Sequence, residues 1–453
     1  MTALLVLPFP YREDSASLFA RIRRRPWAVF LDSGRPGCTQ GRYDVLAWGP
    51  ERTLTTLGTV TRIQGPRGSR ESRADPLDLL AEALGPRCDG DPRLPFSGGA
   101  IGAFGYDLAW RLETLPSRHR HDQEPLMAVG VYPSALVVDH IRRRSFLVNA
   151  RGDARALERF ARAFGASSPD PVPFACLGTV RSTLEWPAYL DAFARVQAYI
   201  RAGDCYQVNL ARRFEGCAAG DPWSLYAALR GVNPVPFGAY LELPGWRVLS
   251  ASPERFLHIR GDRVETRPIK GTRPRDPDPE RDRALAEALL TSPKDRAENL
   301  MIVDLLRNDL GRACRIGSVR VPELFRLEGF PRVHHLVSRI TGRLEPGKGA
   351  PDLLRGAFPG GSVTGAPKIR AMEVIEELET HARGFYCGAI GYLGFDGSMD
   401  TNIAIRTLVM TGRRFHFWSG GGIVADSRAR QEFEETLHKA APFLDLLQRG
   451  RRV

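Results

Sequence analysis

The chain has 453 residues and a formal net charge of +12, with 43% hydrophobic and 26% charged residues. A single hydrophobic core seldom serves so long a chain, so we expect two lobes, and this composition excludes disordered and fibrous proteins. The basic residues are scattered and are not interleaved with aromatic ones, which argues against a nucleic-acid-binding protein and a membrane-surface protein.

Residues 1–164 alternate short strand-like runs with glycine and proline turns. The strand-like runs are Trp27–Leu31, Tyr43–Trp48, Ala128–Tyr132 and Ala135–Val138. Helical periodicity occurs at Leu77–Leu84 and Arg151–Phe164. These patterns predict an N-terminal region built from an antiparallel sheet with attached helices. Residues 165–180 are rich in proline and serine, which favour neither helix nor strand, so we predict a linker there.

Longer helical patterns mark residues 181–453 as a second region. Helices are predicted at Trp186–Ala202, Arg281–Leu290, Asp295–Leu310, Pro367–Glu379 and Arg428–Arg449. Strands are predicted at Val248–Ala251, Gly388–Phe395 and Phe415–Trp418. The whole chain is therefore expected to adopt an α+β fold with large mixed-to-antiparallel sheets backed by helices.

Cysteine usage and hydropathy bear on the cellular compartment. The seven cysteines are dispersed and form no C-x-x-C pair, which is typical of a reducing cytosol. The apolar run Ala3–Leu7 is too short for a signal peptide, and no stretch approaches the roughly 20 apolar residues of a membrane-spanning helix. We expect a cytoplasmic protein that does not enter a membrane.

Lysine is rare in this chain, which makes each lysine informative. Of the 64 basic residues, the lysines are Lys270, Lys294, Lys348, Lys368 and Lys439. Lysine should persist where guanidinium cannot serve, for instance where an amine must lose its proton and attack carbon.

The C-terminal helical pattern places acidic residues on one face. Glu432, Glu435 and Lys439 share that face, and carboxylates one turn apart could hold Mg²⁺. The alternative is a solvated Glu-to-Lys pair, which is common on helix surfaces. Before this helix, Gly420–Gly422 follow a predicted strand, and we expect a turn whose backbone N–H groups approach an anion.

A second glycine-rich segment lies at Phe358–Lys368. Its exposed N–H groups, the Ser362 and Thr364 hydroxyls and the Lys368 ammonium suit a carboxylate, whereas the spacing of a nucleotide-binding P-loop is absent. Two anion cradles without a nucleotide motif point to a small substrate that carries two carboxylates.

Two further segments carry candidate chemistry. Glu298 lies on the predicted helix Asp295–Leu310, where an acid is usually just solvated. A hairpin around Gly261 could bring Glu254 near Lys270, pairing a candidate general acid with a candidate amine nucleophile. The alternative for Lys270 is a surface lysine or one that merely pairs with a carboxylate.

Taken together, several segments resemble the chorismate-binding enzymes, a family that includes anthranilate, aminodeoxychorismate, isochorismate and salicylate synthases. The segments are SPERF, PIKGTRPR, ENLMIVDLLRNDLGR, HHLVSRITG, FPGGSVTGAPKIRAMEVI, YCGAIGYLGFDGSMDTNIAIRTL and GGGIVADSRARQEFEETLHKA. FLDSG, RYDVL and PFSGGAIGAFGYDL also look like the family's N-terminal region. The resemblance implies two lobes around a central cleft, with residues 181–453 as the catalytic region.

One position distinguishes the branches of this family. Anthranilate synthases carry alanine in a P-I-A-G-T context, whereas aminodeoxychorismate synthases carry lysine, as in PIKGT here. Lys270 therefore implies the aminodeoxychorismate branch, which makes 4-amino-4-deoxychorismate for 4-aminobenzoate and folate. The alternative is the synthase component I of the anthranilate branch, in the tryptophan pathway.

The resemblance also implies roles for individual residues. Lys270 would attack chorismate and Glu254 would act as the acid. Mg²⁺ would be held by Glu298 and Glu435, with Glu432 in the same shell. The positions that match the substrate pocket are Tyr386, Arg406, Gly420, Gly421, Gly422, Lys439, Ser362, Thr364, Gly365, His335 and Gln207.

Two partners or ligands follow from the same resemblance. Cys38 lies in GCTQG, which lacks the G-x-C-x-G nucleophile turn of class I glutaminases, so we expect a separate glutaminase subunit to supply ammonia. Some relatives hold tryptophan in an N-terminal pocket, and the matching positions here are Ser33, Gln40, Gly41, Arg42, Tyr43, Pro236, Phe237 and Gly238.

Overall fold

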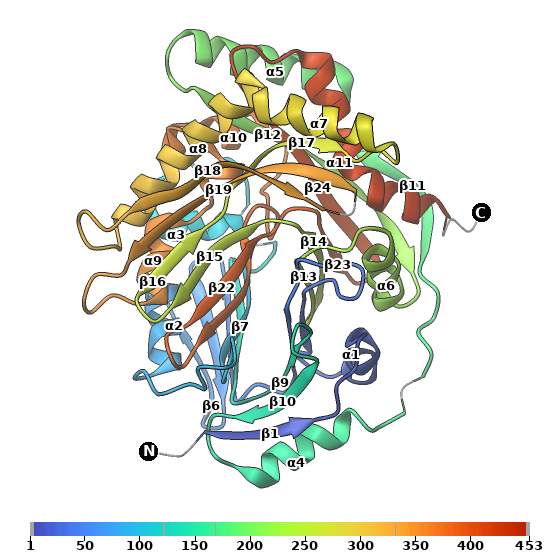
Figure 1. The fold of residues 1–453 in the computed structure, drawn as a ribbon, viewed down its shortest axis with the longest axis vertical. Coiled ribbons are helices and arrows are strands. Elements are labelled where there is room, and N and C mark those ends of the chain that lie inside the picture. Colours follow the sequence, from blue (N-terminus) through green and yellow to red (C-terminus); the bar gives the residue numbers. More distant parts are fainter. Residues whose placement is uncertain (1–3, 121–122, 168, 331, 450–453) are drawn as a thin grey trace.

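The computed structural model describes residues 4–120, 123–167, 169–330 and 332–449. In this part of the chain two 12-stranded sheets face each other, and helices cover their outer sides (Figure 1). The strand pairs at the centre of each sheet are antiparallel. The predicted α+β architecture of large sheets backed by helices is therefore confirmed.

The first sheet runs from one N-terminal edge strand to the edge beside the C-terminal helix. In spatial order its strands are β1 (Leu5–Phe9), β10 (Arg144–Asn149), β9 (Ser134–Asp139), β3 (Tyr43–Ala47), β2 (Val29–Asp32), β13 (Phe237–Leu243), β14 (Trp246–Ser252), β23 (Thr407–Thr411), β24 (Arg414–Ile423), β12 (Gln207–Ala219) and β11 (Ala175–Ser182), with β20 (Gly365–Ala366) paired to β12.

The second sheet carries the predicted hairpin and most of the remaining strands. In spatial order they are β17 (Ile269–Pro274), β19 (Val333–Arg343), β16 (Arg263–Thr266), β15 (Arg255–Arg260), β22 (Met399–Ile403), β21 (Ala389–Gly394), β7 (Gly99–Phe104), β8 (Met127–Tyr132), β4 (Arg52–Leu57), β5 (Val60–Gly65) and β6 (Gly68–Ser72), with β18 (Arg320–Gly329) paired to β19.

Most helices start with a residue that suits a helix N-terminus. The helices are α1 (Ala16–Ile22), α2 (Pro76–Leu84), α3 (Ala109–Leu112), α4 (Ala154–Ala163), α5 (Trp186–Arg201), α6 (Pro222–Val232), α7 (Pro279–Thr291), α8 (Pro293–Gly311), α9 (Ala350–Ala357), α10 (Lys368–Leu378) and α11 (Ala429–Arg449). Asp75, Asp221 and Ser292 each accept a hydrogen bond from a first-turn N–H, and proline occupies the first helical position after each.

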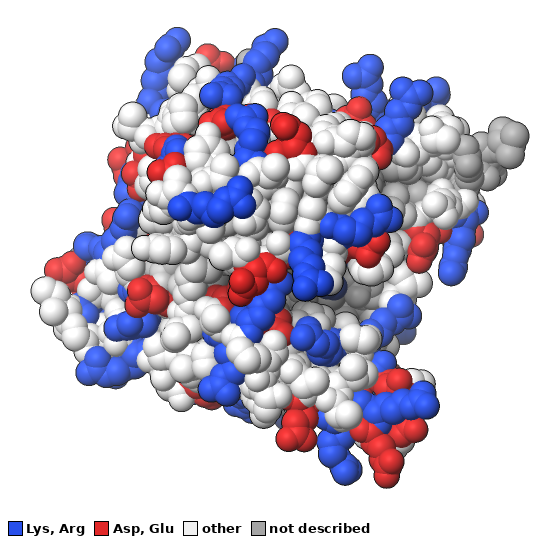
Figure 2. All heavy atoms as spheres, turned by 90° about the horizontal axis from the view of Figure 1, so that it is seen from above, with Lys and Arg blue, Asp and Glu red and all other residues white. Residues whose placement is uncertain are grey.

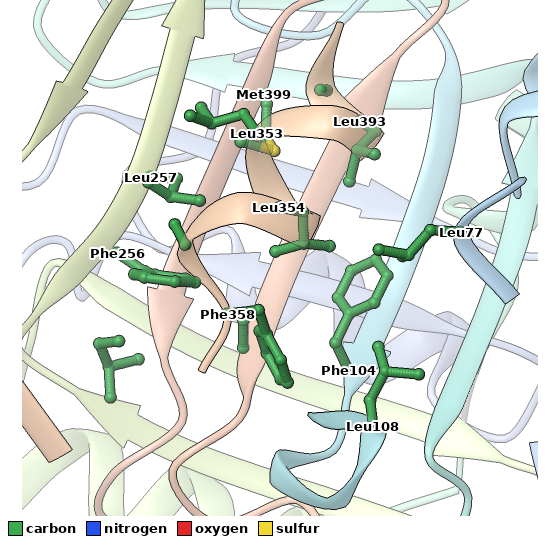
Figure 3. Packing of buried hydrophobic residues seen from close by; sticks show 14 of the residues in the cluster. Leu77, Phe104, Leu108, Phe256, Leu257, Leu353, Leu354, Phe358, Leu393 and Met399 are labelled. Atoms are coloured by element: carbon green, nitrogen blue, oxygen red, sulfur yellow. The ribbon is translucent and has the colours of Figure 1, made fainter. Parts of the chain in front are cut away.

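Hydrophobic side chains pack between the two sheets and beneath the helices that cover them. Between the sheets, Val29, Ile101 and Leu241 are fully buried. On the outer side of the second sheet, Leu353 and Leu354 of α9 pack toward side chains of β15, β21, β22 and β7 (Figure 3). Each such leucine contributes about 1.5–3 kcal/mol by leaving water. The packing fixes the helices against the sheets and so positions the residues described below.

Strands from both halves of the sequence pair with each other in both sheets. β2 pairs with β13 in the first sheet, and β7 pairs with β21 in the second. Residues 175–180 of the predicted linker belong to β11, because the antiparallel edge of β12 offers them hydrogen-bond partners. The residues before and after positions 165–180 thus share common sheets.

The surface carries mixed charges. Figure 2 shows Lys and Arg side chains interspersed with Asp and Glu and with uncharged residues on the face seen from above. Ion pairs of the chain include Arg370 with Asp204 and Arg195 with Glu377. In the part of the chain that the structure describes, no helix is both long and apolar enough to span a membrane.

Candidate active site

Glu254 and Lys270 lie close together and are joined through Ser362. β15 and β16 pair in antiparallel register as the predicted hairpin, which is confirmed, and Lys270 follows on β17. Its Nζ donates a hydrogen bond to the Ser362 carbonyl oxygen at 2.8 Å. The Ser362 hydroxyl and the Ile269 backbone N–H bond to the Glu254 carboxylate. Ser362 therefore contacts both the candidate nucleophile and the candidate acid and fixes their relative positions.

Burial shifts the two ionisable groups in opposite directions. Burial lowers the pKa of Lys270, while the carboxylates of Glu298 and Glu254 oppose that shift. Burial raises the pKa of Glu254, although its bond from Ser362 and the Lys270 ammonium act against this. Both shifts favour neutral forms, namely a free amine and a protonated carboxyl. These are the forms that a nucleophile and a general acid need.

Three acidic side chains from two helices lie in one neighbourhood. Glu298 belongs to α8, and Glu432 and Glu435 belong to α11. Burial raises the pKa of Glu298, and repulsion from Glu432 adds to it. Burial also raises the pKa of Glu432, with repulsion from Glu435 as a further cause. The fold thus brings the three predicted metal ligands close enough for repulsion between neighbouring carboxylates to raise the pKa of Glu298 and of Glu432.

Two lysine ammonium groups accompany these carboxylates. Lys294 Nζ lies 3.9 Å from Glu298 Oε1 and 3.6 Å from Glu432 Oε1. Lys439 Nζ lies 2.6 Å from Glu435 Oε1, and it lowers the pKa of that carboxyl. The Glu-to-Lys pair considered as an alternative on α11 is therefore present beside the acidic cluster.

The donor set fits a hard cation. Mg²⁺ prefers oxygen ligands, and the cluster offers only carboxylate oxygens. A Cβ built at Gly421 would lie 3.2 Å from Glu432 Oε2 and 3.6 Å from Glu435 Oε1, so both carboxylates border one glycine. Across the described ranges, however, no three Asp, Glu, His or Cys side chains already form a metal-binding group. Lysine ammonium groups now neutralise these carboxylates. The carboxylates could therefore bind Mg²⁺ only after the side chains rearrange.

The three glycines before α11 occupy a strand, so the predicted turn is wrong. Gly420–Gly422 continue β24 and pair with β12. The pairing of β24 with β23 on its other side ends at Phe417, so the glycine stretch has one edge without a partner strand. The Gly420 carbonyl oxygen accepts a hydrogen bond from Lys439 at 3.0 Å. The physical reason for glycine is close approach, because a Cβ at Gly422 would meet Gln207 Nε2 at 2.6 Å.

The second glycine-rich segment forms a short 3-10 turn followed by β20. The Thr364 hydroxyl donates within this segment, to the backbone carbonyl of Gly360 or Gly361. Gly365 has φ +148°, and a Cβ there would lie 2.1 Å from the Gln207 carbonyl oxygen, so only glycine fits. Ser362 faces Lys270, as described above.

Lys368, which the sequence suggested for a substrate carboxylate, pairs instead with an acid of the protein itself. Its Nζ lies 2.7 Å from Asp309 Oδ2 and donates to the Ala357 carbonyl oxygen at 2.8 Å. Asp309 is almost completely buried, so the ion pair is sequestered beneath α8. The sequence cannot reveal this partner because α8 and α10 meet only in the tertiary structure.

Arg406 presents a cation that is not neutralised. Burial lowers its pKa, and within the described residues no hydrogen bond or ion pair reaches its guanidinium. Its backbone has φ +49°, a conformation that is uncommon for a residue with a side chain and often marks functional positions. Burial, together with the Arg406 charge, lowers the pKa of neighbouring His335 to about 3. His335 bonds to the Thr272 hydroxyl at 2.9 Å.

Gln207 and Tyr386 provide further polar and aromatic surfaces. Gln207 is fully buried, and neither its side-chain oxygen nor its nitrogen has a hydrogen-bond partner in the described structure. A buried amide without partners costs about 1–3 kcal/mol, so this side chain is expected to hydrogen-bond to a ligand or a water. The Tyr386 ring stacks on Trp418 with centroids 5.9 Å apart.

A buried ion pair, which the sequence did not single out, supports this region. Arg383 bonds to both Glu379 carboxylate oxygens, and it also donates to the Val363 and Asn209 carbonyl oxygens. The pair therefore links the second glycine-rich segment to β12. Its sequence signal is the i,i+4 spacing, which on its own usually indicates an exposed helix pair.

The predicted N-terminal pocket residues line a cavity between the two sheets. Its volume is about 150 Å³, and it is lined among others by Ser33, Gln40, Gly41, Arg42, Tyr43, Pro236, Phe237 and Gly238. The Ser33 hydroxyl is buried without a hydrogen-bond partner in the described structure. The cavity wall also contains the ion pair of Arg255 with Asp400 at 2.9 Å. The cavity is thus lined by charged side chains and by apolar ones, including Phe237 and Ile390.

Comparisons with known proteins cover nearly the whole chain. A family model described as chorismate binding enzyme matches residues 28–445. Aminodeoxychorismate synthase component 1 of Klebsiella aerogenes is 46% identical over 454 residues, covering 99% of this chain and 100% of that protein. Anthranilate synthase component 1 of Thermus thermophilus is 42% identical over 431 residues, covering 93% and 92% respectively. The crystal structure of anthranilate synthase component I from Streptococcus pneumoniae has a TM-score of 0.76 at 34% identity, covering 88% of this chain and 91% of that chain.

Proposed function

The chain belongs to the chorismate-binding enzymes, and we propose that it converts chorismate and ammonia into 4-amino-4-deoxychorismate. The observation that carries this proposal is Lys270, a lysine whose pKa is lowered by burial and which shares Ser362 with the acid Glu254. Similarity over the full length to aminodeoxychorismate synthase component 1 supports the same branch.

The reaction is proposed to proceed in two displacements. The neutral Lys270 amine bonds to C2 of the ring, the double bonds shift, and the C4 hydroxyl leaves as water with a proton from Glu254. Ammonia then bonds to C4, the double bonds shift back, and the bond between C2 and Nζ breaks. The net change exchanges a hydroxyl for an amine. A covalent route of this kind divides one difficult displacement into two easier ones.

Magnesium is proposed to be the cofactor, held by Glu298 and Glu435 with Glu432 in the same shell. When bound, it would act as a Lewis acid and template for the ring carboxylate. The chain's own contribution is to supply carboxylate oxygens from two helices that are fixed by packing against the sheets.

The second substrate carboxylate is proposed to bind near Arg406. A guanidinium can hold a carboxylate through two parallel hydrogen bonds, and this one carries no competing partner in the described residues. Tyr386, the open edge of Gly420–Gly422 and the buried amide of Gln207 complete the proposed pocket, with Lys439, Ser362, Thr364, Gly365 and His335 around it.

Ammonia is proposed to come from a separate glutaminase subunit in the cytoplasm. The component 1 designation of the Klebsiella relative supports a second component. Cys38 does not resemble a nucleophile, because burial raises the pKa of its thiol.

The cavity between the sheets is proposed to hold tryptophan. Ser33 supports this, since its buried hydroxyl faces the cavity region without a partner in the described structure. Charged groups of both signs line the cavity for an amino acid's ammonium and carboxylate: Arg42, which pairs with Asp139, and Asp400, which pairs with Arg255.

Intact-mass analysis tests the catalytic proposal. Incubation with chorismate and Mg²⁺ without ammonia should give a covalent adduct that peptide mapping places on Lys270. Lys270→Ala should lose the adduct and the aminated product but keep its fold. Lys348→Ala is the matched control, because Lys348 pairs with Glu345 at 2.8 Å and donates to the Arg312 carbonyl oxygen, neither of which belongs to the candidate site.

Two results would overturn parts of the proposal. Full activity of Lys270→Ala would remove the covalent mechanism. Formation of anthranilate and pyruvate from chorismate, Mg²⁺ and ammonium would instead assign the chain to anthranilate synthase component I, the alternative that the Thermus relative represents.

A further inference from the structure

Lys294 lies between two of the proposed metal ligands, where a cation is needed. It belongs to the first turn of α8, so Glu298 is one turn further along the same helix. Its Nζ is 3.9 Å from Glu298 Oε1 and 3.6 Å from Glu432 Oε1. One ammonium therefore neutralises carboxylates from two different helices.

We propose that the Lys294 ammonium is a tethered cation that takes the place of Mg²⁺ between Glu298 and Glu432 in the metal-free enzyme and must leave when the metal binds. The inference rests on the proposed magnesium site. Two largely buried carboxylates that converge without a cation repel each other, so the metal-free state needs a substitute positive charge. Lys294 supplies that charge from within the chain.

The geometry indicates that Lys294 is held loosely enough to be exchanged. Its two contacts exceed hydrogen-bond length, and its side chain is 48% exposed. By contrast, Lys368 is held at 2.7 Å by Asp309 and its side chain is only 11% exposed. Lys439 also makes a short contact, 2.6 Å from Glu435. Of these three lysines, Lys294 can swing into solvent with the smallest loss of contacts.

The choice of lysine fits a cation that has to leave. Only five of the 64 basic residues are lysine, so arginine would be the expected residue at an ordinary surface pair in this chain. A guanidinium would bind both carboxylates through a fork of several N–H groups and would be harder to displace. An ammonium on a flexible stem binds as a point charge and can be released.

Competition between Lys294 and Mg²⁺ has a measurable consequence. The apparent affinity for metal is lowered by the fraction of enzyme in which the ammonium occupies the site. A neutral residue of similar length should therefore tighten metal binding, and arginine should weaken it. A purely structural salt bridge would give no such opposite effects.

Direct binding of Mn²⁺, which reports a magnesium site by electron paramagnetic resonance, tests this inference without any turnover. Wild type, Lys294→Met, Lys294→Arg and the control Lys348→Met are titrated in the absence of chorismate, after thermal unfolding in EDTA has verified that each is folded. We expect Lys294→Met to bind Mn²⁺ about fivefold or more tightly than wild type, Lys294→Arg to bind more weakly, and Lys348→Met to match wild type.

The possible failures are distinguishable. No Mn²⁺ binding by any of the proteins would overturn the proposed metal site together with this inference. Binding by wild type that is unchanged or weakened in Lys294→Met would overturn the exchange alone. If Lys294→Met does not fold, the arginine variant decides, because binding as tight as wild type would exclude competition.

Discussion

Replacing Glu254 by glutamine separates proton donation from structure. Glu254 is 5% exposed, and its carboxylate accepts bonds from the Ser362 hydroxyl and the Ile269 N–H. Glutamine has the same shape and keeps one acceptor oxygen, so at most one of these bonds is lost. The free energy of unfolding should fall by only about 1 kcal/mol.

The catalytic loss should be much larger than the structural one. Glutamine cannot supply the proton with which the C4 hydroxyl leaves. Loss of a positioned general acid costs roughly 10²–10⁴ in rate, or about 3–5 kcal/mol of barrier. The expected increase in the activation barrier is several-fold larger than the expected loss of unfolding free energy. We therefore expect kcat to fall steeply in a protein that remains folded.

The assay compares kcat for aminated product, at saturating chorismate, Mg²⁺ and ammonium, with the midpoint of denaturant unfolding. Glu242→Gln is the matched control, because burial also raises the pKa of that glutamate, which pairs with Arg247 at 2.7 Å. Its kcat should equal that of wild type. The reasoning is refuted if Glu254→Gln keeps kcat within about tenfold of wild type.

Two further predictions concern pH and the cavity between the sheets. The rate of adduct formation on Lys270 should follow a bell-shaped pH profile, because raising the pH supplies the neutral amine of Lys270 and removes the proton of Glu254. Glu254→Gln should lose the alkaline limb of this profile, because glutamine has no proton to lose. An unchanged bell in that variant would contradict the pairing of Glu254 with Lys270. Calorimetric titration should detect tryptophan binding to wild type, and Ser33→Val, which narrows the cavity and removes the hydroxyl, should weaken it. A wild type that binds no tryptophan would end that proposal.

The sequence by itself determined the long regular elements and several residues of the candidate site. The periodic patterns predicted α5, α8 and α11 to within a few residues, because a helix that packs one face on a sheet must repeat its apolar residues every three or four positions. The hairpin of β15 and β16 was also predictable, since its glycine turn is local. The short helices α1 and α9 were not, because so few turns carry little periodicity. α6 was also missed, although it is as long as the predicted α10.

Only the tertiary structure decided which charged groups meet. Nothing near Lys368 in the sequence reveals that Asp309 holds it, and nothing near Lys294 reveals Glu432 on another helix. Gly420–Gly422 look like a turn in isolation, yet they form a strand because β12 lies alongside them. The physical reason is that ion pairs, burial and sheet hydrogen bonds depend on distances between segments far apart in the chain, which local residue preferences do not encode.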